Sequence, residues 1–144
     1  MDSQTTVKHQ IESIPCIHLP VTNLERSVEF WTGNFDCTFG DEYQPETKMA
    51  SVRIENGDWI FLYEVEKVPT APSFKGGTLN NSDNDQVFAA TLNVKNPQEL
   101  FENLKEHGVR LGQLREAWTG HAFDCYDPDG HKFNIWGGEW IESE

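Results

Sequence analysis

The sequence predicts an α+β domain made of two βαβββ modules, which together form a curved mixed sheet around a cavity. Two observations support this prediction. A pattern of strand, helix and further strands occurs twice, and an Asp-Pro-Asp-Gly turn at residues 127–130 joins the last two strands. With 144 residues, 37% of them hydrophobic, the chain is long enough for one domain with a core, which we expect to span residues 1–144.

The first module is expected over residues 14–66. Ile14 to Val21 alternates as a half-buried strand does, and Thr22 or Asn23 caps the helix that follows. Three short strands follow the helix, and an Asn-Gly turn joins the last two of them. Residues 67–86 are polar and rich in turn-forming residues, so they are predicted to be a linker.

The second module is expected over residues 87–137. Its start repeats the start of the first module, because the segment 92–98 matches the segment 19–25 at a constant offset of 73 residues. The leucine, the valine and the capping asparagine recur at this offset. Such self-similarity indicates two copies of one supersecondary unit.

Composition excludes some partners. The chain has 11 Lys and Arg against 24 Asp and Glu, and its formal net charge of −13 disfavours nucleic acid and anionic membranes and attracts cations. Three widely spaced cysteines, Cys16, Cys37 and Cys125, form no CxxC pair, which favours a reduced intracellular chain. The start of the chain lacks the apolar run of a signal peptide, so we expect a soluble, cytoplasmic protein.

Strand alternation divides the side chains between two faces. We expect the helices to cover a continuously apolar face that includes Phe61 and Tyr63, with Trp31 and Trp59 serving packing. The other face mixes polar and apolar groups, as ligand cavities do, although it could instead pack against a partner subunit. The residues predicted to bind a small-molecule ligand there are Cys16, His18, Ile60, Leu62, Glu64, Ala89, Thr91, Trp118, Asn134 and Trp136.

The motifs at residues 17–31, 118–120 and 127–133 resemble the vicinal oxygen chelate superfamily. This superfamily includes glyoxalase I, bleomycin resistance proteins, extradiol dioxygenases and fosfomycin-modifying thiol transferases. The resemblance covers about residues 14–137. It implies the paired βαβββ fold, a ligand crevice and a homodimer.

The resemblance also implies which positions of this chain would hold a metal ion. Members with metal chemistry place four ligands on the first and last strands of the two modules, and these positions correspond here to Cys16, Leu62, Ala89 and Asn134. Leucine and alanine side chains cannot bind a metal ion. We therefore expect no metal and no cofactor, as the resemblance implies for bleomycin resistance proteins.

The predicted function is therefore metal-independent binding of a small organic ligand, with a cationic aromatic molecule as the candidate. The alternative is an enzyme: a metal-dependent lyase, dioxygenase or thiol transferase with non-standard ligands such as Cys16, His18 and Glu64, or a metal-free isomerase with Glu64 or His18 as base. A nucleophilic Cys16 paired with His18 is disfavoured, because side chains two residues apart on a strand lie about 6–7 Å apart.

Overall fold

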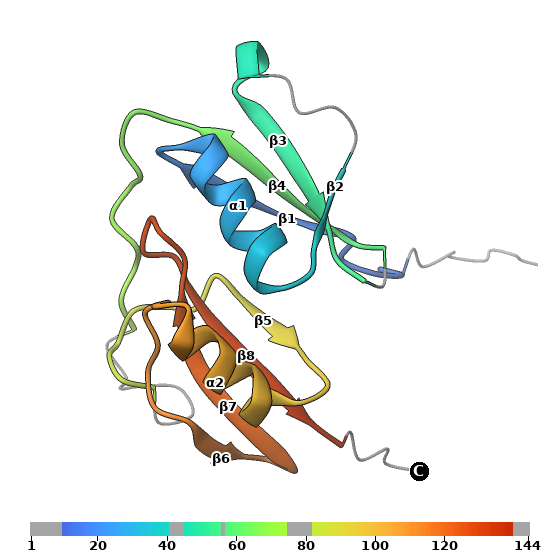
Figure 1. Cartoon of the computed structure of the whole chain (residues 1–144), viewed down its shortest axis with the longest axis vertical. Helices are drawn as coiled ribbons and strands as arrows, with labels where there is room; N and C mark the ends of the chain where they lie inside the picture. The colour runs from blue at the N-terminus through green and yellow to red at the C-terminus, as the bar shows by residue number, and fades with distance from the viewer. Residues whose placement is uncertain (1–9, 41–44, 56, 75–81, 140–144) are drawn as a thin grey trace, which may run out of the picture.

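The computed structural model describes residues 10–40, 45–55, 57–74 and 82–139. Within these ranges lie two α-helices, one short 3₁₀ helix and eight strands (Figure 1). In chain order they are β1 (Cys16–Val21), α1 (Leu24–Asn34), β2 (Thr38–Phe39), η1 (Pro45–Thr47), β3 (Met49–Arg53), β4 (Trp59–Glu64), β5 (Ala90–Asn93), α2 (Pro97–Glu106), β6 (Arg115–Ala117), β7 (Gly120–Tyr126) and β8 (Lys132–Gly138).

The strands form two four-stranded sheets with the same topology. The first sheet has the order β1-β4-β3-β2 and the second has the order β5-β8-β7-β6. In each sheet the first strand pairs in parallel with the last strand of its module, and the remaining pairs are antiparallel. The predicted α+β fold class of paired βαβββ modules is therefore confirmed.

The helix starts reproduce the sequence repeat. The Asn23 side chain accepts a hydrogen bond from the Arg26 amide at 3.0 Å, and the Asn96 side chain accepts one from the Glu99 amide at 3.1 Å. Each asparagine satisfies an amide that has no partner within its helix. Pro97 then opens α2, where its missing amide costs nothing.

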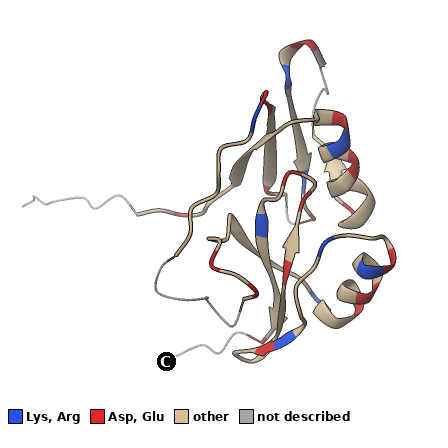
Figure 2. Cartoon of the chain, turned by 90° about the vertical axis from the view of Figure 1, so that its left-hand side faces the viewer, with Lys and Arg blue, Asp and Glu red and all other residues tan. Residues whose placement is uncertain are grey.

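Both helices lie on the same side of their sheets, as the two perpendicular views show (Figure 1 and Figure 2). α1 buries Leu24, Val28 and Trp31 against the first sheet, and these apolar residues recur at the spacing of one face of a helix. The helices and loops carry many of the acidic side chains, and these helical glutamates are exposed: Glu25, Glu29, Glu99, Glu102 and Glu106. No helix in the described ranges is both long enough and apolar enough to cross a membrane.

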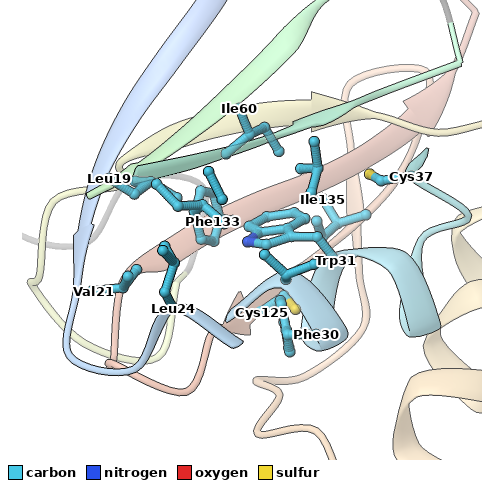
Figure 3. Close-up of a cluster of buried hydrophobic side chains, with 14 of the residues drawn as sticks. Leu19, Val21, Leu24, Phe30, Trp31, Cys37, Ile60, Cys125, Phe133 and Ile135 are labelled. Atoms are coloured by element: carbon cyan, nitrogen blue, oxygen red, sulfur yellow. The ribbon is translucent and has the colours of Figure 1, made fainter. Parts of the chain in front are cut away.

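A single hydrophobic core joins the two modules (Figure 3). Trp31 of α1 meets Phe133 of β8 edge to face, with ring centroids 5.2 Å apart. Polar contacts reinforce the junction: the Asp129 carboxylate forms an ion pair with Arg26 at 3.1 Å and accepts a hydrogen bond from the Thr22 amide at 3.1 Å. The β7–β8 turn is therefore anchored to the start of α1.

Candidate ligand-binding site

The face of the first sheet that points away from α1 carries a row of aromatic side chains. The parallel register aligns Ile17 with Ile60 and Leu19 with Leu62, and these residues pack in the core under α1. Because side chains alternate along a strand, their neighbours point the other way. We call this surface the aromatic face, and it consists of Cys16, His18, Ser51, Arg53, Trp59, Phe61 and Tyr63.

The rings of the aromatic face form a stacked row. The His18 and Phe61 rings lie 5.4 Å apart with an interplanar angle of 13°, and the Phe61 and Trp59 rings lie 6.4 Å apart at 26°. The Arg53 guanidinium lies 5.2 Å from the centroid of the Trp59 ring. The three aromatic residues of β4 are only partly buried, so their faces remain accessible to a flat molecule.

Cys16, His18 and Tyr63 are linked by side-chain contacts. The Cys16 Sγ lies 3.4 Å from His18 Nε2, and His18 Nδ1 lies 2.7 Å from the Tyr63 hydroxyl. The Cys16–His18 separation is therefore shorter than the spacing of about 6–7 Å that disfavours such a pair in a regular strand. The two side chains lean toward each other along β1, which brings a thiol within hydrogen-bonding distance of an imidazole.

Three predicted site residues lie on the helix side instead. Ile60 and Leu62 are 2% and 0% exposed and belong to the core. The Glu64 carboxylate accepts a hydrogen bond from the Leu24 amide at 3.3 Å, so it satisfies the start of α1. The predicted faces of β4 are therefore wrong. This strand is apolar on both sides, and only its register with β1 decides which side meets the helix.

The corresponding face of the second sheet holds a buried polar network. The Arg115 guanidinium donates to Asp124 at 3.0 Å and to the Asn134 amide oxygen at 2.8 Å. The Asn134 amide nitrogen lies 3.3 Å from the Thr91 hydroxyl. Asp124 and Asn134 are 0% and 5% exposed, so the predicted ligand position at Asn134 is occupied by the protein's own guanidinium.

The end of the predicted linker covers this network. The buried Lys132 ammonium donates to the Asn84 carbonyl, the Asn84 side-chain oxygen and the Gln86 carbonyl at 2.9–3.0 Å. The Ser82 hydroxyl donates to Asp124 at 2.7 Å. Burial lowers the pKa of Lys132, which is the direction expected for an amine removed from water. This stretch of linker is therefore a packed part of the second module.

The other predicted residues also belong to the second module. The Ala89 amide donates to the Lys132 carbonyl, and Ala89 and Thr91 are exposed. Trp118 is 81% exposed and meets the buried Trp136 edge to face, with centroids 6.0 Å apart. The predicted set is thus divided between two sheets, and only Cys16 and His18 lie on the aromatic face.

Two cavities occur elsewhere among the described residues. One of about 290 Å³ lies beside the linker and is lined by Phe74, Phe88 and Lys132 among others. A second, open one of about 710 Å³ lies where Arg26, His107 and Arg110 approach the β7–β8 turn. Neither of these two cavities includes a residue of the aromatic face.

The comparison with known protein families agrees with this architecture. The profile described as the Glyoxalase/Bleomycin resistance protein/Dioxygenase superfamily matches residues 13–135. The chain belongs to this superfamily. A search of curated protein sequences finds no relative of the chain.

Solved structures share the superfamily fold. The fosfomycin resistance protein FosX from Listeria monocytogenes is 21% identical, with a TM-score of 0.67 over 90% of this chain and 96% of its own. A superfamily domain from Frankia sp. EAN1pec is 17% identical, with a TM-score of 0.67 over 92% and 96%. TnmS3, an antibiotic binding protein from Streptomyces sp. CB03234, is 14% identical, with a TM-score of 0.66 over 92% and 100%.

The Listeria FosX has been solved with Mn(II) and sulfate. The side chains at the positions carried over from the superfamily, as far as the structure describes them, do not fit such an ion. The described residues contain no group of three or more His, Cys, Asp and Glu side chains arranged to hold a metal. Among the four positions carried over from the superfamily, Leu62 lies in the hydrophobic core and the Ala89 side chain has no atom that can bind a metal. The Asn134 side-chain oxygen accepts a hydrogen bond from Arg115.

Sequence reasoning missed Phe61, Tyr63 and Trp59 as members of the exposed face. It also missed Arg115 and Lys132, whose charges are buried in the second module. The sequence does carry a signal for the buried role of Lys132. This lysine lies in the alternating segment after the β7–β8 turn, and a lysine between buried positions of a central strand needs oxygen partners.

Proposed function

We propose that this superfamily member binds a small planar organic molecule on the aromatic face. The observation that carries the proposal is the stacked row of His18, Phe61 and Trp59, in which the interplanar angles of adjacent rings are 13° and 26°. Offset stacking on such a row contributes about 0.5–1.5 kcal/mol per ring pair beyond area burial. The antibiotic-binding TnmS3 and the resistance protein FosX share the fold, which supports a ligand-binding role.

The charges near this face favour a neutral or anionic ligand. Arg53 is the charged side chain of the aromatic face, and within strands β1 to β4 no carboxylate shares it, because Glu64 points toward α1. The cationic ligand expected from the net charge of −13 remains a prediction that local charge does not support.

The binding test compares two aromatic dyes of opposite charge, the anionic anilinonaphthalene sulfonate and the cationic proflavine. We expect saturable binding, with the anionic dye preferred, and Phe61→Ala should weaken binding about two- to tenfold through the loss of one stacking partner. Trp118→Ala is the matched control, since this exposed aromatic side chain lies on the second module. Equal effects of the two substitutions would place the site elsewhere.

Two further expectations belong to the proposal. Metal independence is tested by elemental analysis of protein purified without chelators or a histidine tag, and near-stoichiometric metal would favour the enzyme alternative. The homodimer is tested by light scattering, since a second copy could complete the open aromatic face into an enclosed crevice. A strictly monomeric protein that still binds the dye would show that one chain suffices.

A further inference from the structure

We propose that Cys16 is a reactive thiol, activated by His18 and positioned through Tyr63, that forms a covalent bond with flat electrophiles such as aromatic α,β-unsaturated carbonyl compounds. The three side chains form a chain of contacts in which a nucleophile meets a base and the base meets an orienting group. This arrangement is not implied by the binding proposal, which requires only the rings.

The contacts around His18 fix its ring. Its Nδ1 lies 2.7 Å from the Tyr63 hydroxyl, and its plane stacks on Phe61 at 5.4 Å. In the tautomer whose Nδ1–H donates to the Tyr63 oxygen, the Nε2 lone pair points at the Cys16 sulfur, 3.4 Å away. The imidazole is then placed to accept the thiol proton.

The reaction needs no oxidant and no leaving group. His18 Nε2 takes the Cys16 proton, and the thiolate attacks the β-carbon of the unsaturated carbonyl compound. The C=C electron pair moves onto the carbonyl oxygen as an enolate, and the α-carbon then receives the proton from the imidazolium. The net result is addition of S–H across the double bond, which restores neutral His18.

The surroundings favour an aromatic electrophile. Phe61 and Trp59 extend the flat row beside His18, and the Arg53 guanidinium, 5.2 Å from the centroid of the Trp59 ring, places a positive charge on the same face. The titratable and charged groups that face Cys16 from β1, β3 and β4 are His18, Tyr63 and Arg53. An enolate forming here would therefore meet no carboxylate from these strands.

The chain contains its own controls. Cys37 and Cys125 are 6% and 1% exposed, and burial raises their pKa values to about 11 and about 12. Both stay protonated near neutral pH and out of reach of a reagent. Cys16 is partly exposed, so one site of reaction is expected among the three.

The test is the rate of adduct formation with cinnamaldehyde, resolved by peptide mass spectrometry at about pH 7 and about pH 9.5. We expect a single adduct at Cys16 and a loss of at least about tenfold at the lower pH in His18→Gln, with the rates converging at the higher pH. Tyr63→Phe should give a smaller loss, and Cys16→Ser should abolish the adduct.

Two results would overturn the proposal: a Cys16 rate equal to that of N-acetylcysteine and insensitive to His18→Gln, or adducts mainly at Cys37 or Cys125. Dye binding separates this outcome from the proposed function. In the wild-type protein, saturable dye binding without a fast Cys16 adduct would overturn the reactive thiol alone, whereas absent dye binding with the His18-dependent adduct intact would overturn the binding proposal alone.

Discussion

Arg115→Met should destabilise the protein through the second module. The Arg115 side chain is 10% exposed and bridges Asp124, which is fully buried, and Asn134. Removing one partner of a buried ion pair costs about 3–5 kcal/mol. The low end of this range applies here, because Asp124 still accepts hydrogen bonds from the Ser82 hydroxyl and the Asp83 amide. We therefore expect a loss of about 3 kcal/mol in unfolding free energy, equivalent to about 6–12 °C in Tm.

Urea denaturation followed by circular dichroism measures this change. Lys95→Met is the matched control, because its ion pair with Glu55 is 89% and 86% exposed and should change stability by less than about 0.5 kcal/mol. A double-mutant cycle with Asp124→Asn should give a coupling of about 1–3 kcal/mol. A loss below about 1 kcal/mol together with zero coupling would refute the inference that the network supports this module.

Three other predictions follow from buried groups and close contacts. Burial raises the pKa of Asp127 above 3.8, so its ionisation weakens the folded state as the pH rises. Asp127→Asn should therefore be as stable as the wild type at about pH 7, or more stable by up to about 1 kcal/mol. Urea titrations should show this difference vanish below pH 3.8, where the carboxyl is protonated in both the folded and the unfolded state. Lys132→Met should speed amide exchange at residues 82–88 at least about tenfold while leaving β1 unchanged, and uniform exchange would contradict this. Gly120→Ala should prevent stable folding because its Cβ would collide with the Gly137 carbonyl, whereas Gly33→Ala in α1 should be neutral or stabilising by thermal melting.

The fold was readable from the sequence because its signals are local. Capping asparagines, a repeated segment and the Asp-Pro-Asp-Gly turn each specify backbone geometry without reference to distant residues. The site was harder to predict because it depends on strand register. β4 has apolar groups at both parities, so its sequence could not show that Ile60 and Leu62 meet the helix while Phe61 and Tyr63 face outward.

The second sheet shows a different limit of sequence reasoning. A run of Asn, Ser and Asp before β5 is typical of a solvated connection, yet Ser82 and Asn84 bind buried charges on β7 and β8. Their partners lie 42 and 48 residues away along the chain. Only tertiary structure brings them together.

The packing of this segment defines where an isolated second module would have to begin. A fragment starting at residue 87 would leave Asp124 without the Ser82 hydroxyl and Lys132 without its three oxygen partners, so that the buried charges would keep only Arg115 and each other as partners. A fragment starting at Ser82 would carry those partners with it. The packed part of the second module therefore extends into the connection, and dissection or circular permutation of this chain should cut before Ser82.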